Sequence, residues 1–307
     1  MLQQENLRIV SLLPSATEIV CALGLSDALV GISHDCDYPP AIEGRPVLSQ
    51  AIITGDLTSA GIDRHIRGQL HRGLSVYHLD QAQLGLLDPT LILTQELCDV
   101  CAPSFTLVQA AARVASSDSR IVSLEPHGLE DILDTVALVG ELTGTRQQAV
   151  GLVAALRDRI RRVRAAVADR PRPRVVCLEW VDPLYVGGHW VPEMVEAAGG
   201  SDLLGRPRDH SYRVEWDAVL GTDPDILVLM PCGFDLQRTR EEARLLTDRP
   251  GWSELRAVRS RGVYMTNGTA YFNRPGPRIV DGLEILAAIL HPGAVSWPLP
   301  QDGSERL

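Results

Sequence analysis

The sequence predicts an α/β protein in which two parallel-sheet α/β lobes are joined by a single long α-helix, with a ligand cleft between the lobes. Short β-branched runs alternate with helical patterns in both halves of the chain, an order typical of mainly parallel sheets. A long amphipathic segment, 145–168, and a proline-containing break at 169–174 separate the two halves. The predicted parts are an N-terminal α/β lobe (8–126), connecting helices (127–170), a C-terminal α/β lobe (171–293) and a loose tail (294–307).

The first half contains strand patterns at 8–12, 28–33, 88–94 and 120–124 and helical patterns at 62–74 and 105–115. Ser15 and Glu18 have the spacing of a capping box. This predicts that Ser15 caps a helix which ends at Gly24.

Two further helices are expected at the centre of the chain, over 129–142 and 145–168. One face of the second carries five arginines: Arg157, Arg159, Arg161, Arg162 and Arg164. They form either a patch for a phosphate or a partner, or a solvated face near a helix C-terminus, where cations are favoured. The second half contains strand patterns at 174–180, 225–230 and 262–266 and helical patterns at 192–199 and 277–290.

Composition excludes several classes of protein. The chain has 307 residues, of which 45% are hydrophobic and 22% charged, so it can bury a core and is not expected to be disordered. Its net charge of −10 argues against a nucleic-acid binder, because such proteins neutralise phosphates with Lys and Arg. No run of about 18 apolar residues is present, so no membrane segment is expected.

The first residues of the chain predict a cytoplasmic location. Residues 1–13 lack the basic region and the long apolar stretch of a signal peptide. In the cytoplasm, the six cysteines are expected to be reduced thiols or metal ligands and not disulfides.

Most of the unusual polar and aromatic residues follow predicted strands. Open parallel sheets bind ligands at the carboxyl ends of their strands, so these residues are candidates to line one cleft. The expected ligand-binding residues are His34, Asp35, Gln95, Glu179, Trp180, His189, Trp190, Tyr271, Phe272, Asn273 and Arg274. The aromatic rings among them would supply flat apolar contact, and the polar groups would hydrogen-bond amides or a phosphate on the ligand.

His189 follows two glycines and precedes Trp190, which indicates a backbone held close to another group. Imidazole is a common ligand of metal centres, including those inside a tetrapyrrole, so His189 is a candidate axial ligand. The alternative is a loop histidine next to a core tryptophan.

Four cysteines, Cys36, Cys98, Cys101 and Cys232, fall in strand-end loops. Cys98 and Cys101 have the spacing of metal ligands, so a zinc or iron–sulfur site is expected from them and Cys36, with Cys232 as a fourth ligand. The alternatives are a redox thiol at Cys101, ahead of a helix N-terminus, or pocket thiols without a metal. No P-loop, dinucleotide-binding glycine motif, zinc-protease motif or nucleophile elbow is present, so a binding protein is expected more than an enzyme.

Several segments resemble the cobalamin-binding subunit of bacterial vitamin importers, in the helical-backbone class of substrate-binding proteins. They lie at 8–18, 30–33, 37–40, 88–92, 199–200 and 271–278, so the resemblance covers nearly the whole chain. It implies two α/β lobes, a rigid connecting helix and one ligand, a corrinoid, in the cleft. Segments 33–37, 97–102 and 188–193 are similar to a cytoplasmic branch of this family.

This chain also differs from the importer subunits at the pocket and docking positions. The importer subunits line their corrin pocket with aromatic residues, and the matching positions here are Asp35, Gln50 and Gln95. They dock on a membrane partner through a glutamate on each lobe, and the matching positions are Asp80 and Ser201, so docking on an importer is not expected.

The leading hypothesis is therefore a cytoplasmic binding protein for a corrinoid (cobalamin-like) or related metal-bearing ligand. The alternative is an enzyme or redox protein that uses a cysteine-ligated zinc or iron–sulfur cluster in the same cleft.

Overall fold

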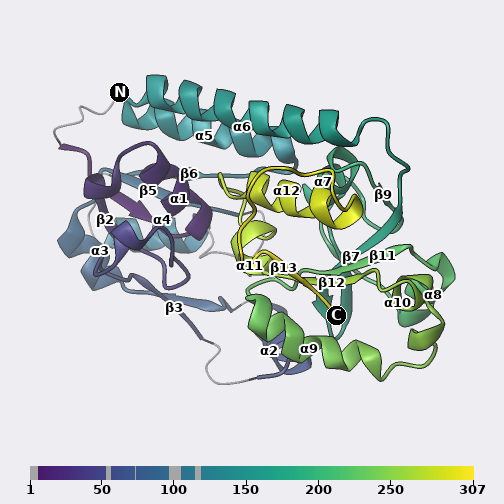
Figure 1. Ribbon diagram of the computed structural model, residues 1–307. Coiled ribbons are helices and arrows are strands. Elements are labelled where there is room, and N and C mark those ends of the chain that lie inside the picture. The colour runs from purple at the N-terminus through teal and green to yellow at the C-terminus, as the bar shows by residue number, and fades with distance from the viewer. Residues whose placement is uncertain (1–5, 53–56, 73, 97–104, 115–118) are drawn as a thin grey trace. The chain divides into compact units, whose positions relative to one another are not determined.

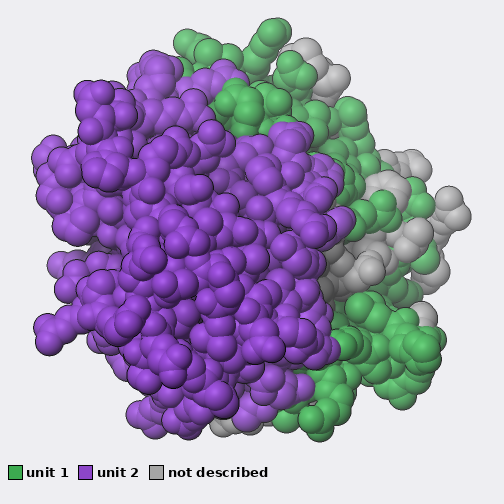
Figure 2. Space-filling model, turned by 90° about the vertical axis from the view of Figure 1, so that its right-hand side faces the viewer, with its two compact units in different colours: residues 1–57, 61–126, 130–155 green, residues 58–60, 127–129, 156–307 purple. Residues whose placement is uncertain are grey.

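The computed structural model describes residues 6–52, 57–72, 74–96, 105–114 and 119–307. The chain divides into two compact units, and each contains a sheet with parallel strands at its centre (Figure 1, Figure 2). Unit 1 comprises residues 1–57, 61–126 and 130–155, and unit 2 comprises residues 58–60, 127–129 and 156–307. The predicted fold class, two α/β lobes with parallel sheets, is confirmed.

Unit 1 is built on a four-stranded parallel sheet with the order β2-β1-β5-β6. These strands are β1 (Ile9–Ser11), β2 (Leu29–Ile32), β5 (Leu91–Thr94) and β6 (Arg120–Ser123), and β3 (Ser49–Ala51) and β4 (Tyr77–Leu79) form a separate antiparallel pair. The helices in this half of the chain are α1 (Pro14–Ala22), α2 (Ser59–His71), α3 (Gln81–Leu87) and α4 (Phe105–Val114). Val10 and Ile92 of the sheet pack with Leu84 of α3 and Val108 of α4 in one apolar core.

The capping box expected at Ser15 is wrong. α1 begins one residue earlier, at Pro14, and its N-cap Leu13 is extended and makes no side-chain cap. Proline suits the first helical position because its φ is already helical and its missing N–H is not needed there. Ser15 is buried in the first turn. The helix does end before Gly24, whose φ of +79° is relaxed only for glycine.

Unit 2 contains a seven-stranded mixed sheet with the order β10-β8-β7-β11-β12-β13, and β9 pairs with β7. Its central parallel neighbours are β7 (Arg174–Val181), β11 (Ile226–Leu229) and β12 (Val263–Thr266). The other strands are β8 (Leu184–Val186), β9 (Ser201–Asp202), β10 (Tyr212–Arg213) and β13 (Ser304–Arg306). The helices are α7 (Val191–Ala197), α8 (Trp216–Thr222), α9 (Leu236–Thr247), α10 (Arg256–Arg259), α11 (Gly268–Tyr271) and α12 (Ile279–Leu290). Leu229 and Met265 of the sheet share a core with Trp216 and Leu246 of the helices.

The two long helices at the centre of the chain are present as α5 (Leu129–Thr143) and α6 (Arg146–Val167). α6 has 22 residues, and they belong to unit 1 up to residue 155 and to unit 2 beyond it. Arg159 is not merely solvated, because its guanidinium donates to both carboxylate oxygens of Glu284 on α12 (3.0 and 2.7 Å) and also pairs with Asp281. Glu284 is 3% exposed, so this ion pair holds the C-terminal half of α6 on α12.

The expected loose tail contains an ordered strand. β13 pairs antiparallel with β12, with Ser304 opposite Thr266. Just before it, the Asp302 carboxylate accepts hydrogen bonds from the Tyr271 hydroxyl (2.8 Å) and the Asn267 amide (2.8 Å). The sequence does not reveal this strand, because three residues are too few to show an alternating pattern.

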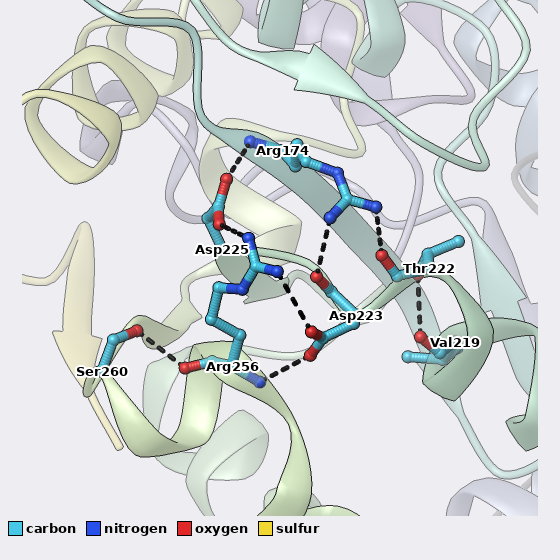
Figure 3. A network of polar contacts seen from close by, with 7 residues as sticks. All are labelled: Arg174, Val219, Thr222, Asp223, Asp225, Arg256 and Ser260. Carbon is cyan, nitrogen blue, oxygen red and sulfur yellow. Dashed lines mark hydrogen bonds and ion pairs between the residues drawn. The ribbon is translucent and has the colours of Figure 1, made fainter.

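A charged network joins the amino ends of β7 and β11 (Figure 3). The Arg174 N–H and the Arg256 guanidinium donate to the two carboxylate oxygens of Asp225 (2.9 Å each). The Arg256 N–H donates to the Asp223 carboxylate (2.7 Å), and the Arg174 guanidinium donates to the carbonyls of Thr222 and Asp223. Burial alone would raise the pKa of Asp225, but the hydrogen bonds from Arg174 and Arg256 outweigh it and lower that pKa.

Candidate functional site

The carboxyl ends of β7, β11 and β12 are neighbours in the sheet of unit 2. The Cys232 N–H, after β11, donates to the carbonyl of Glu179 on β7 (3.0 Å). The ring of Trp180 lies 5.0 Å from that of Phe234, and its Nε1 donates to the Asp182 carbonyl (3.1 Å). The structure therefore brings Glu179, Trp180 and Cys232 to one sheet edge, as the strand-end rule predicts.

Three of the predicted aromatic contacts are core side chains in this structure. Trp190, Tyr271 and Phe272 are 5%, 7% and 0% exposed. Trp190 Nε1 donates to the Phe272 carbonyl (2.7 Å), and burial together with the bond to Asp302 raises the pKa of Tyr271. Phe272 thus offers no surface to a ligand here, and the contacts expected from Trp190 and Tyr271 remain predictions.

Asn273 and Arg274 follow α11, beyond the end of β12. The Asn273 Nδ2 approaches the Met230 carbonyl (3.5 Å), and its Oδ1 is buried without a hydrogen-bond partner in the described part of the chain. A Cβ at Gly268 would lie 2.8 Å from this Oδ1, so glycine permits the close approach. A buried acceptor without a partner is costly, so Asn273 is a candidate to accept a hydrogen bond from a ligand.

A second group of site residues in unit 2 is a cluster of three imidazoles, His127, His189 and His210. Their ring centroids are 4.9 Å apart for His189 and His210, 6.3 Å for His127 and His189, and 6.5 Å for His127 and His210. Backbone hydrogen bonds join two of the segments, from the His189 N–H to the Asp209 carbonyl (2.6 Å) and from the Arg208 N–H to the His189 carbonyl (2.9 Å).

His189 occupies a strained backbone position, with φ of +50°. Its preceding residue must be glycine, because a Cβ at Gly188 would lie 2.2 Å from the Ser211 nitrogen. The ring stacks on Trp190 at 5.4 Å, and its Nδ1 is buried with no partner among the residues described. Burial, followed by the neighbouring His210 and His127, lowers the pKa of His189 from 6.5 to about 4, so this imidazole is neutral at neutral pH.

Glu193 links the third segment of the cluster to the other two. One carboxylate oxygen accepts from the Leu129 N–H (2.8 Å), next to His127 in sequence, and the other lies 3.7 Å from the Arg208 guanidinium. A Cβ at Gly128 would lie 2.6 Å from Arg208, so glycine again permits close approach.

The sequence missed His127 and His210. His210 lies two residues before β10, and His189 lies between β8 and α7. The short antiparallel strands β8 and β10 were not expected. No local pattern marks His127 or His210, and the pairing of β8 with β10 is the signal that would have found His210.

In unit 1, His34, Asp35 and Gln95 follow β2 and β5, on either side of β1. His34 Nδ1 lies 2.9 Å from the Ser49 hydroxyl, and its Nε2 lies 3.5 Å from the Asp35 carboxylate. Gln95 is 4% exposed, and its Nε2 has no partner among the described residues. These predicted residues thus lie at the carboxyl end of the unit 1 sheet, as expected.

The structure does not support the cysteine-ligated zinc or iron–sulfur site. Cys36 belongs to unit 1, where its Sγ lies 3.0 Å from the Thr17 hydroxyl, and Cys232 is an exposed thiol of unit 2. Across the described ranges, no group of three or more His, Cys, Asp or Glu residues could hold a metal ion. Cys98 and Cys101 lie outside the described residues, so a site that depends on them remains a prediction.

Comparison with known proteins shows the same fold and family along nearly the whole chain. A family model described as "Periplasmic binding protein" matches residues 9–269. A cobalamin-binding protein of Halobacterium salinarum is 25% identical over 300 residues, which cover 94% of this chain and 71% of that protein. An uncharacterized ABC transporter substrate-binding lipoprotein of Bacillus subtilis is 24% identical over 301 residues, which cover 95% of this chain and 82% of that protein.

Solved structures with the same fold include a periplasmic heme binding protein from Pseudomonas aeruginosa, with a TM-score of 0.72, 22% identity and 98% of each chain covered. A periplasmic vitamin B12 binding protein of Vibrio cholerae has a TM-score of 0.66 and 21% identity, and covers 92% of this chain and 96% of its own. In the portion of the chain that is described, no helix is long and apolar enough to cross a membrane.

Proposed function

Because the chain belongs to the periplasmic binding protein family, we propose that it is a substrate-binding protein whose ligand is a corrinoid such as cobalamin. The observation that carries the proposal is the alignment of a protein named cobalamin-binding with 94% of this chain. Haem is the competing ligand of the same general shape, because a heme binding protein shares the fold.

Two features of unit 2 support the proposal of a large flat ligand with polar edges. Trp180 is a partly exposed ring at the carboxyl edge of the unit 2 sheet. Asn273 Oδ1 in unit 2 is buried with no partner among the described residues, so it offers an acceptor. Corrinoids carry amide side chains, which can donate a hydrogen bond to this oxygen.

Coordination of the ligand metal by His189 is a finer part of the proposal. A neutral imidazole is the form that ligates metals, and the lowered pKa of His189 keeps it neutral. Replacement of an axial ligand of cobalt or iron changes the visible spectrum, so the two parts of the proposal can be tested together.

The test is a titration of the purified protein with cobalamin and, separately, with haem, followed by calorimetry and by visible absorption. We expect saturable binding of cobalamin at about micromolar concentrations, the range in which small-ligand sites of this size commonly operate. The proposal would be overturned if neither cobalamin nor haem produced any heat of binding or any spectral change. Binding of haem alone would replace the corrinoid with haem.

Location and docking remain predictions from the sequence. Asp80, at one position matching a docking glutamate, caps α3 by accepting from the Gln83 N–H (2.9 Å), so its carboxylate serves its own helix. Fractionation of the native cells would test the cytoplasmic location, and co-purification with a membrane permease would contradict the expected loss of docking.

A further inference from the structure

We propose that Ser59 is a positioning residue, which together with Glu242 of α9 holds the ring of Trp180 ready for the ligand. All three residues belong to unit 2. The inference rests on the proposed function, because it concerns a ring that is proposed to contact the ligand. It adds a residue that supports binding from within the protein.

Ser59 is the anchored residue of α2. Every residue of α2 is described, and Ser59 alone among them is buried. Its hydroxyl donates to Oε2 of Glu242 (2.6 Å), 183 residues later in the chain, and Glu242 is 5% exposed. The other oxygen, Oε1, accepts from the Arg238 guanidinium (2.8 Å). A buried carboxylate is stable only when its oxygens accept such bonds, so the Ser59 hydroxyl fills a definite requirement of Glu242.

The backbone of Ser59 holds the indole of Trp180. Trp180 Nε1 donates to the Ser59 carbonyl (3.3 Å) and to the Asp182 carbonyl (3.1 Å). An indole has a single N–H, so these two bonds leave Trp180 no donor for a ligand. Trp180 therefore offers a ligand the carbon surface of its ring, which suits a flat conjugated molecule.

A second route of contacts leads from Ser59 back to the same ring. The Arg238 guanidinium, which pairs with Glu242, lies over the ring of Phe234, with its carbon 5.1 Å from the ring centre. The ring of Phe234 lies in turn 5.0 Å from that of Trp180. The contacts thus form a closed set that joins Trp180, Phe234, Arg238, Glu242 and Ser59.

A ring that is fixed before the ligand arrives increases affinity. Each side chain that must be immobilised on binding costs free energy, and a ring already held in one rotamer avoids this cost. Trp180 is only partly buried, so its own packing does not fix it completely. Ser59 has no exposed surface, so its effect on the ligand must act through Trp180.

The experiment is a double-mutant cycle on cobalamin affinity, with the free energy of unfolding measured for every variant. Ser59→Ala is expected to weaken cobalamin about fivefold, the effect of having to order one side chain on binding. Phenylalanine has no N–H for the Ser59 carbonyl. In a Trp180→Phe background, Ser59→Ala is therefore expected to weaken binding by less than about twofold more.

Thr143→Val is the matched control for the loss of a buried hydroxyl. Thr143 is as buried as Ser59, and its hydroxyl donates to the Val139 carbonyl within α5 (2.7 Å). This variant is expected to lose stability and to bind cobalamin like the parent protein. If Ser59→Ala does not fold, Glu242→Gln takes its place in the cycle, because an amide keeps the shape of the side chain and is a weaker acceptor than a carboxylate.

Two outcomes of the cycle would overturn the inference and leave the proposed function intact. One is equal affinity of the parent protein and Ser59→Ala, and the other is the same loss with and without the Trp180 ring. A parent protein that binds neither cobalamin nor haem would overturn the proposed function and the inference with it.

A second measurement tests the position of the ring in the free protein. The chain has five tryptophans, and the indole N–H signal of Trp180 is identified in NMR spectra by its absence from Trp180→Phe. In Ser59→Ala we expect this signal to shift and to exchange faster with water. The signal of Trp190, whose Nε1 donates to the Phe272 carbonyl (2.7 Å), should stay unchanged. An unmoved Trp180 signal would contradict the positioning role of Ser59.

Discussion

The two ends of the central strands in unit 2 differ in whether their polar groups have hydrogen-bond partners. At the amino ends of β7 and β11, Arg174, Asp225 and Arg256 satisfy one another and nearby backbone groups (Figure 3). At the carboxyl ends, Asn273 Oδ1 is buried with no hydrogen-bond partner among the described residues. In the loop that follows the antiparallel strand β8, His189 Nδ1 is likewise buried without a described partner, and His189 has a strained backbone. The difference indicates that one end stabilises the unit and that the other keeps polar groups ready for a ligand.

The largest expected effect on stability is at the amino ends. Asp225→Ala removes the acceptor for the Arg174 N–H and for the Arg256 guanidinium. We expect a loss of about 2 kcal/mol in the free energy of unfolding, since each such bond contributes about 1 to 2 kcal/mol when partly exposed. Denaturant unfolding measures it, and cobalamin affinity serves as the control. If Asp225→Ala kept its stability but bound cobalamin more weakly, the amino ends would serve binding and not stability, contrary to the account.

Acid should destabilise the protein through His189 first. The pKa of His189 is about 4 when folded and 6.5 when unfolded, so the unfolded state takes up a proton first as the pH falls. Its contribution to stability is therefore present above pH 6.5 and is lost as the pH falls towards 4. We expect about 1 kcal/mol less stability at about pH 5 than at about pH 7, after allowance for partial exposure.

The same pH series on His189→Asn provides the matched control. The lowered pKa of Asp225 affects stability only below its unfolded value of 3.8. The contributions of His189 and Asp225 to stability are therefore lost in different pH ranges. A parent protein and a His189→Asn variant with the same slope between about pH 7 and 5 would contradict the assignment to His189.

At neutral pH, His189→Asn should affect binding more than folding. Asparagine tolerates a left-handed backbone, which offsets the lost stacking on Trp190, so we expect a stability change of about 0.5 kcal/mol. Cobalamin affinity should fall about tenfold, because the proposed coordination of the ligand metal by His189 is lost. Thermal melting and calorimetry on the same preparation would show the split; a large melting shift with normal affinity would make His189 structural.

The smallest effect on stability is expected at Asn273. Asn273→Ala removes an acceptor with no partner among the described residues and a long Nδ2 contact with the Met230 carbonyl (3.5 Å), so the unfolding free energy should change by less than about 0.5 kcal/mol. Binding of a ligand that donates there should weaken. If the variant unfolds much more easily, Asn273 contributes to the fold through contacts other than its Oδ1.

The sequence predicts the long, periodic elements well and the short antiparallel ones poorly. α5 and α6 are visible because many turns repeat the same apolar spacing, and β5 and β11 are visible as apolar runs. β8, β10 and β13 have two or three residues each, too few for a pattern, and tertiary pairing alone defines them.

The candidate site divides in the same way. The strand-end rule found Trp180, Asn273 and Gln95, because each follows or ends a strand that the sequence shows. His127 and His210 join His189 through the pairing of β8 with β10, the backbone hydrogen bonds between His189 and residues 208–209, and the Glu193 bond to the Leu129 N–H. Such contacts depend on the folded backbone, so residue type and spacing alone could not group the three histidines.

Hydrogen exchange with and without cobalamin tests most directly whether the carboxyl ends of the unit 2 strands bind the ligand. The account predicts slower exchange with cobalamin in peptides covering 179–182 and 267–274 at the carboxyl ends and in the His189 loop, 187–190, and unchanged exchange at the amino-end network in 222–225 and 256–260. Protection confined to the amino-end peptides, or no protection at either end while cobalamin is bound, would contradict it.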